Sequence, residues 1–260
     1  MCFDHDSRPP IPEIAGGALD GQRETLTAAD GTRVLAFRAR PAAASGNGVV
    51  ILPDVRGLHP YYEELALRFA ERGIEALAID WFGRTAADDD RSEGFEYLPH
   101  VMQTTWAGIG TDIAAGVAGL RDAAEGETGP GAVFTLGFCM GGRMSFLAGT
   151  LGLDLAGVIG FYGTLMGPWR NDAPEPVAEA GRIGSPVLGL FGGADAAITP
   201  EAIAAFDAAL TDADTEHRLV TYPGAPHSFF DRKAAEFADA SAAAWGETLA
   251  FIATNGAGEA

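Results

Sequence analysis

The chain has 260 residues, of which 47% are hydrophobic, so it can fold as one large α/β domain or as two small ones. A formal net charge of −19 argues against binding to nucleic acid or anionic membranes, because long-range repulsion opposes the encounter. The chain has no uncharged apolar run of about 20 residues, no secretory signal pattern and only two cysteines, which together predict a cytoplasmic protein without a membrane span.

The predicted elements begin after an N-terminal arm. Three prolines and a Gly–Gly pair predict a tail or arm over residues 1–20, followed by a single domain over residues 21–260. Residues 32–39 alternate apolar and polar side chains, as a half-buried edge strand does. The apolar, β-branched run 48–53 predicts a strand buried on both faces, and the apolar stripe in 61–73 predicts a helix.

The alternation of strands and helices continues to the end of the chain. Further strands are predicted at 74–80, 132–138, 155–163, 186–193 and 217–224. Helices are predicted at about 99–123, 141–150, 200–211 and 232–253. This order predicts an α/β fold with a mostly parallel central sheet and helices on both faces. The irregular stretches 83–98 and 163–184 follow strand ends, so they are either walls of a pocket or plain surface loops.

The segment TLGFCMGGRM, residues 135–144, carries the candidate nucleophile. Its centre reads Gly137-Phe138-Cys139-Met140-Gly141, which is the G-x-S-x-G nucleophile elbow with sulfur in place of the serine oxygen. Glycines are required there because the nucleophile has a strained backbone and its neighbours approach other backbone closely. The positive end of the following helix favours a thiolate. The pattern therefore predicts Cys139 as a nucleophile.

A thiol nucleophile needs a base, and the base needs an acid that orients it. In hydrolases with this elbow, the acid and then the histidine follow the nucleophile along the chain. His217 opens a predicted strand, whereas His227 lies in a loop after a strand. Asp195 stands just past the buried strand 186–193, a position that no other later aspartate shares. We therefore predict His227 as the base and Asp195 as the acid.

The loop after strand 48–53 is expected to complete the site. An oxyanion hole would combine the backbone N–H of Met140 with that of Val55 or a neighbour in PDVRGLH. The same loop holds Asp54 and Arg56. The Asp54 carboxylate would face the sulfur, unless Asp54 serves only as a turn residue.

Aromatic side chains follow several of the predicted strands. Trp81, Phe82 and Tyr162 come after strand ends, and Phe138 precedes the candidate nucleophile. They would line an apolar substrate pocket or, equally well, belong to the core.

With these residues in place, the chain resembles the dienelactone hydrolase family of α/β hydrolases from about residue 20 to residue 253. Four segments carry the resemblance in order: ILPDVRGLHPYYEELALRFAERG, LGFCMGGR, FGGADAAITP and YPGAPHSFFD. The resemblance implies an α/β-hydrolase fold with Cys139, Asp195 and His227 as its triad. In the family, a carboxylate in the segment matching PDVRG touches the resting thiol and helps to deprotonate it. That position is Asp54 here, where the best-known members have glutamate.

The resemblance supports the reaction type better than the substrate. The family's type substrate is an unsaturated lactone with a carboxylate, opened to maleylacetate in the breakdown of chlorinated aromatics. Two arginines hold that carboxylate in the type members, one of them shortly after the triad histidine. Here Asp231 lies near that position and Arg232 one step beyond. Arg56, Arg84 or Arg91 could bind such a carboxylate instead.

These expectations together describe a hydrolase that opens a small activated lactone or ester by acyl transfer to a thiolate. One alternative keeps the triad in a broader carboxylesterase or thioesterase for small acyl substrates. Another makes Cys139 a redox-sensing thiol in a protein without hydrolytic activity. No cofactor motif or zinc spacing is present, and CFDHD at residues 2–6 lies too close to the terminus to make a convincing metal site.

Overall fold

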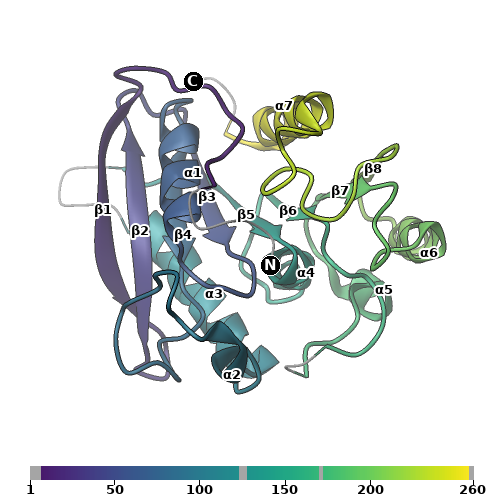
Figure 1. The fold of residues 1–260 in the computed structure, drawn as a ribbon, viewed down its shortest axis with the longest axis horizontal. Helices are drawn as coiled ribbons and strands as arrows, with labels where there is room; N and C mark the ends of the chain where they lie inside the picture. The colour runs from purple at the N-terminus through teal and green to yellow at the C-terminus, as the bar shows by residue number, and fades with distance from the viewer. Residues whose placement is uncertain (1–6, 123–127, 170–171, 258–260) are drawn as a thin grey trace.

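The computed structural model describes residues 7–122, 128–169 and 172–257. Eight strands form one sheet in the order β1-β2-β4-β3-β5-β6-β7-β8 (Figure 1). The strands are β1 (Ala18–Thr27), β2 (Arg33–Pro41), β3 (Asn47–Leu52), β4 (Glu75–Ile79), β5 (Ala132–Phe138), β6 (Gly157–Phe161), β7 (Val187–Gly192) and β8 (His217–Tyr222). The pairs β1–β2 and β2–β4 are antiparallel. The pairs β4–β3, β3–β5, β5–β6, β6–β7 and β7–β8 are parallel.

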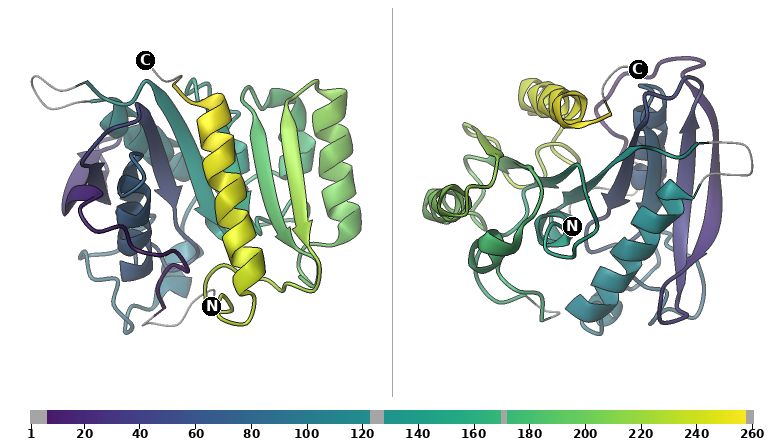
Figure 2. Two further views of the ribbon diagram at one scale, coloured as in Figure 1. Left: turned by 90° about the horizontal axis from the view of Figure 1, so that it is seen from above. Right: turned by 180° about the vertical axis from the view of Figure 1, so that it is seen from behind.

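Helices cover both faces of the sheet. They are α1 (Pro60–Ala70), α2 (Tyr97–Val101), α3 (Trp106–Arg121), α4 (Met140–Ala148), α5 (Pro176–Glu179), α6 (Pro200–Asp212) and α7 (Ala238–Asn255), with a 3₁₀ turn η1 (Ala180–Arg182) after α5. α1 and α7 share one face, where the Phe69 and Trp245 rings lie 4.7 Å apart. α3, α4 and α6 cover the other face, and Figure 2 shows α7 lying across the sheet. The predicted mostly parallel sheet with helices on both faces is confirmed.

The central strands carry the core. All six residues of β3 and of β7 are buried, which matches their apolar, β-branched sequences. Glycines on the strands make room for aromatic rings. A Cβ at Gly160 of β6 would lie 2.3 Å from the Phe146 ring of α4, so this strand and this helix pack closely because no side chain separates them.

Two local predictions were wrong. Residues 32–39 are not an edge strand, because β1 pairs with β2 along its whole outer side and buries it. β1 was missed because its charged sequence, ALDGQRETLT, lacks the apolar residues of a typical strand. The helix expected at about 99–123 is two helices, since Thr105 has extended backbone and caps α3 by accepting a hydrogen bond from Gly108 N–H.

The start of the chain is ordered against α1 within the described residues. Strand β1 begins at Ala18, inside the range expected to be an arm. Ile11 is buried, the Arg72 guanidinium donates to the Pro12 carbonyl at 3.2 Å, and Ile14 N–H donates to Glu71 at 3.0 Å. These contacts attach residues 11–14 to the end of α1 and the turn after it.

Candidate active site

Cys139 sits at a sharp turn between β5 and α4. Its backbone has φ 55° and ψ −111°, a conformation that costs energy for a residue with a side chain. A Cβ at Gly137 would lie 1.9 Å from the carbonyl oxygen of Gly141, and a Cβ at Gly141 would lie 2.0 Å from that of Leu52. The turn therefore tolerates only glycine at these two positions. The fold presents Cys139, which is half-buried, at the first turn of α4.

His227 and Asp195 are hydrogen-bonded across neighbouring loops. His227 Nδ1 lies 2.7 Å from Asp195 Oδ2, and the Asp195 side chain is 1% exposed while that of His227 is 29% exposed. The parallel pairing of β7 with β8 brings both loops to the carboxyl edge of the sheet. Asp195 Oδ1 also accepts a hydrogen bond from Ala197 N–H at 2.9 Å, which holds the carboxylate in place. The buried carboxylate thus orients a partly accessible imidazole.

The other histidines of the described chain have structural surroundings. His59 is the N-cap of α1 and accepts a hydrogen bond from Tyr61 N–H through Nδ1. The His100 ring stacks on Phe95 with centroids 4.9 Å apart. His217 lies within hydrogen-bonding distance of Thr215 O and of Asp207. His5 and the CFDHD stretch lie outside the described residues.

The loop after β3 is held tightly from neighbouring elements. Asp54 is fully buried, and its N–H donates to the Tyr62 hydroxyl at 2.9 Å. Asp54 Oδ1 accepts a hydrogen bond from Arg56 N–H at 2.9 Å. The Trp81 indole N–H points at the carbonyls of Pro53 and Asp54, 3.1 Å from each. Trp81 therefore shapes the loop that carries Asp54, Val55 and Arg56.

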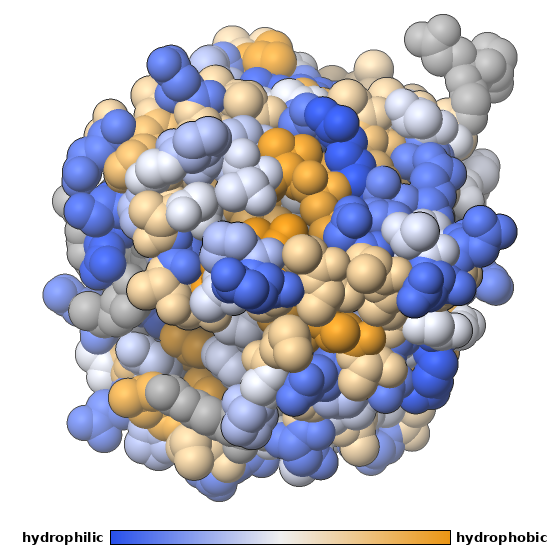
Figure 3. All heavy atoms as spheres, turned by 90° about the vertical axis from the view of Figure 1, so that its right-hand side faces the viewer, coloured by the Kyte–Doolittle hydropathy of each residue, from blue (hydrophilic) through white to orange (hydrophobic). Residues whose placement is uncertain are grey.

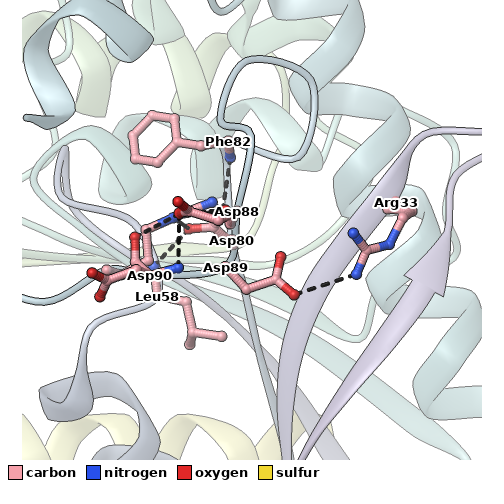
Figure 4. A network of polar contacts seen from close by, with 8 residues as sticks. Arg33, Leu58, Asp80, Phe82, Asp88, Asp89 and Asp90 are labelled. Atoms are coloured by element: carbon pink, nitrogen blue, oxygen red, sulfur yellow. Dashed lines mark hydrogen bonds and ion pairs between the residues drawn. The ribbon is translucent and has the colours of Figure 1, made fainter. Parts of the chain in front are cut away.

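Asp80, directly after β4, anchors the same loop at Leu58 (Figure 4). Its Oδ1 accepts a hydrogen bond from Leu58 N–H and its Oδ2 one from Phe82 N–H, both at 2.9 Å. The Arg91 guanidinium donates to the same carboxylate, with 2.9 Å from Nη2 to Oδ2. A Cβ at Gly57 would lie 2.3 Å from Asp80 Oδ1, so the backbone packs directly on the carboxylate. Sequence reasoning missed this role of Asp80.

The two arginines of the 83–98 loop form ion pairs within the protein. Arg84 forms ion pairs with Asp112 and with Asp30, the latter at 2.7 Å. Arg91 is 4% exposed and bound to Asp80. Arg143 of α4, which the sequence did not single out, donates to the carbonyls of Gly167, Ala173 and Pro174 and so holds the 163–175 loop.

Tyr162 and Asp231 form a buried pair beside His227. The Tyr162 hydroxyl donates to Asp231 Oδ2 at 2.8 Å, and its ring lies 4.9 Å from the imidazole of His227. Burial raises the pKa of Asp231 to about 8, opposed by the hydrogen bonds from Tyr162 and from Arg232 N–H, while the charge of Asp54 adds to the rise. Tyr162 has a left-handed backbone, φ 39°, at the end of β6. Sequence reasoning named Tyr162 but gave Asp231 no role, because nothing local marks it as buried.

Two surface grooves lie apart from these residues, on either side of the edge strand β8. One, of about 290 Å³, lies between β7, β8 and α6, and the other, of about 270 Å³, between β8 and α7. Figure 3 views this side of the molecule, where apolar side chains show in a hollow framed by hydrophilic ones. Neither groove contains Cys139, Asp195 or His227.

Within the described ranges, no group of three or more His, Cys, Asp or Glu side chains is arranged to hold a metal ion. The same residues include no helix of the length and apolarity needed to cross a bilayer.

Comparison with known proteins identifies the family of the chain. A family model described as "Dienelactone hydrolase family" matches residues 34–256. A protein of Salmonella typhimurium named "Putative carboxymethylenebutenolidase" is 28% identical over 226 residues, covering 85% of this chain and 82% of its own length. A Synechocystis protein with the same name is 29% identical over 220 residues, covering 82% and 88%.

Solved structures share the fold. The crystal structure named "Putative Dienelactone Hydrolase" from Klebsiella pneumoniae superposes with a TM-score of 0.77 at 26% identity, covering 90% of this chain and 99% of that one. A dienelactone hydrolase-like promiscuous phosphotriesterase from metagenomic libraries gives a TM-score of 0.71 at 24% identity, covering 91% and 99%. The predicted resemblance is confirmed: the chain belongs to the dienelactone hydrolase family and has its α/β-hydrolase fold.

Proposed function

We propose that this dienelactone hydrolase-like enzyme cleaves small activated esters or lactones by acyl transfer to Cys139, with His227 as base and Asp195 as its orienting acid. The observation that carries the proposal is the strained elbow, which presents a cysteine at the same sheet edge as a hydrogen-bonded histidine–aspartate pair. Strain of this kind persists only where the surrounding structure enforces it. The flanking glycines and the close approach of β3 do so here.

The proposed reaction has two steps. The Cys139 thiolate adds to the ester carbonyl, and the resulting oxyanion accepts hydrogen bonds from the amides of Met140 and Val55. Collapse of this intermediate leaves a thioester on Cys139 and expels the alcohol or enol, which is protonated by the imidazolium formed when His227 took the proton of the thiol. His227 then takes a proton from water, which attacks the thioester and releases the acid and the thiol. A thiolate suits an activated leaving group, because sulfur leaves the tetrahedral intermediate more readily than a poor leaving group does.

The surroundings support these roles. Met140 opens α4, so its N–H has no partner within the helix. The Asp54 amide donates to the Tyr62 hydroxyl of α1, and the amides of Arg56 and Gly57 donate to Asp54, which fixes the backbone around Val55. Asp54 is fully buried in that loop, and we propose that it assists deprotonation of the thiol.

The substrate contacts follow from the same geometry. Tyr162 and Arg56 are the proposed contacts. Trp81 acts on the substrate only through the loop that it supports. The Arg84 guanidinium is paired with Asp112 and Asp30, so Arg84 is not among the proposed contacts. We further propose a cytoplasmic setting. If the substrate is an enol lactone, we also propose a role in aromatic degradation.

A carboxylesterase or thioesterase of broader scope is the second candidate. The feature that favours it is the occupation of Arg84 and Arg91 by aspartates, which leaves Arg56 as the remaining proposed ligand for a carboxylate-bearing lactone. Turnover of a charged dienelactone, compared with that of neutral 4-nitrophenyl esters and acyl thioesters, separates the two candidates.

The decisive experiment is ester hydrolysis by wild type and by Cys139→Ala, before and after alkylation of the thiol. We expect the variant and the alkylated enzyme to lose turnover by about a thousandfold or more. Hydrolysis at the wild-type rate by Cys139→Ala would refute the nucleophile. A protein that turns over no ester, but changes its properties reversibly when Cys139 is oxidised, would instead be a redox sensor.

A further inference from the structure

The charge around the candidate base is set by carboxyl groups. Asp54 and Asp231 are buried at 0% and 5% exposure, and the charge of Asp54 helps to raise the pKa of Asp231. Asp231 is one side chain away from His227, because Tyr162 contacts both. Asp231 therefore lies beside the imidazole, and Asp54 is close enough for its charge to act on Asp231.

The other elements packed against this turn add little charge. Tyr61 of α1 donates to the carbonyl of Phe230, and Ser241 of α7 donates to that of Phe229. Both side chains are neutral. On the turn itself, Arg232 contributes its backbone N–H to Asp231, and its side chain is exposed to solvent.

The cations of the neighbouring loops are mostly neutralised. Arg84 and Arg91 are paired with aspartates, as described above. Arg56 is the basic residue of the β3 loop and lies two positions from Asp54.

We propose that Asp231 determines the charge preference of the acyl site, so that the enzyme, once Asp231 is ionised, disfavours acyl groups with a carboxylate relative to those without charge. This inference rests on the proposed function, since it concerns the substrate of the same site. Once Asp231 is ionised, a carboxylate bound near the base would lie close to a second negative group. Its repulsion grows when Asp231 loses its proton, and a neutral acyl group does not feel it.

The pH dependence follows from the state of Asp231. With a pKa of about 8, Asp231 is protonated at pH 6 and ionised at pH 9. Discrimination against anionic substrates should therefore increase as the pH rises through about 8. A unit charge about 8 Å away, at an effective dielectric constant of about 20, changes an equilibrium by about thirtyfold, so a tenfold effect is a conservative expectation.

The test compares two esters of matched length, 4-nitrophenyl hexanoate and mono-(4-nitrophenyl) adipate, between pH 6 and pH 9. The adipate carries its carboxylate throughout this range. The measured quantity is the ratio of kcat/KM for the hexanoate to that for the adipate, in which any change common to both esters cancels. For wild type we expect the ratio to rise about tenfold from pH 6 to pH 9.

Asp231→Asn is the principal variant. Asparagine can accept the Arg232 N–H bond through its oxygen and donate to the Tyr162 hydroxyl through its amide, so the pair keeps its shape. We expect its ratio to be independent of pH. Asp212→Asn is the matched control, because it loses the same charge at an exposed position. Asp212 ends α6 just before the start of β8, at the amino ends of the parallel strands rather than at their carboxyl ends. Its ratio should follow wild type.

Tyr162→Phe provides a second variant that does not depend on the folding of the first. Loss of the hydroxyl removes a bond that lowers the pKa of Asp231, so the rise in the ratio should move to higher pH. A wild-type preference for the adipate at pH 9, or a rise that persists unchanged in Asp231→Asn, overturns the inference and leaves the hydrolase proposal standing. Absence of turnover for both esters overturns the proposed function and this inference with it.

Discussion

Replacing Arg91 with methionine should strongly destabilise the protein, because it leaves the Asp80 carboxylate buried without a cation. The two side chains are 2% and 0% exposed, and Arg91 donates to both carboxylate oxygens. In the variant, Asp80 keeps only the backbone amides of Leu58 and Phe82. Breaking a buried pair in this way costs about 3–5 kcal/mol. That is a large part of the 5–15 kcal/mol that stabilises a typical domain.

Urea unfolding at pH 7 measures this loss as a lower midpoint at an unchanged slope. Adding Asp80→Asn to Arg91→Met should recover much of the lost stability, because the buried group is then neutral. Arg33→Met is the matched control: its partner Asp89 lies in the same loop, the pair spans 3.3 Å, and its side chains are 65% and 48% exposed. An exposed pair of this kind contributes about 0–1 kcal/mol. If Arg91→Met cost no more than Arg33→Met, the reasoning about buried charge would be refuted.

The remaining predictions concern the site. Asp195→Asn should lower kcat for ester hydrolysis by about a hundredfold or more, since His227 loses the acceptor that orients it, and a normal rate would exclude that role. Gly141→Ala should fold poorly by circular dichroism, because its methyl group would lie 2.0 Å from the carbonyl oxygen of Leu52. Asp231→Asn should gain stability over wild type as the pH rises from about 4 to about 8. Between these pH values the wild-type protein takes up a proton at Asp231 when it folds, because the pKa of Asp231 is higher in the folded state. The stability of wild type therefore falls by up to about 1.4 kcal/mol per pH unit, and that of the variant does not. Parallel pH–stability curves would contradict this.

Features with a local cause could be predicted from the sequence. The runs at 48–53 and 186–193 are apolar because both faces of those strands are covered, and they were placed to within a residue or two. The G-x-C-x-G turn was recognisable because its glycines answer a local need for close backbone approach. His227 and Asp195 followed from their order and from their positions just after predicted strands, and the structure joins them by a hydrogen bond.

Features that depend on a distant partner could not be predicted in this way. The charged segment β1 forms a strand because its backbone pairs with that of β2, and its own sequence does not predict this pairing. From the sequence, Arg84 was a candidate ligand for a substrate carboxylate. In the structure its guanidinium is paired with Asp112 and Asp30, which are distant along the chain.

The order of elements and the candidate reactive groups could thus be predicted from the sequence, because periodicity and turn chemistry act between neighbours along the chain. The electrostatic character of the site was decided by the tertiary structure. Asp231 is one of 36 acidic residues in the sequence. The fold buries it, which raises its pKa, and brings to it the hydroxyl of Tyr162, 69 positions away, beside the candidate base. Such a group depends on desolvation and on neighbours in space, and neither is encoded in the residues around it.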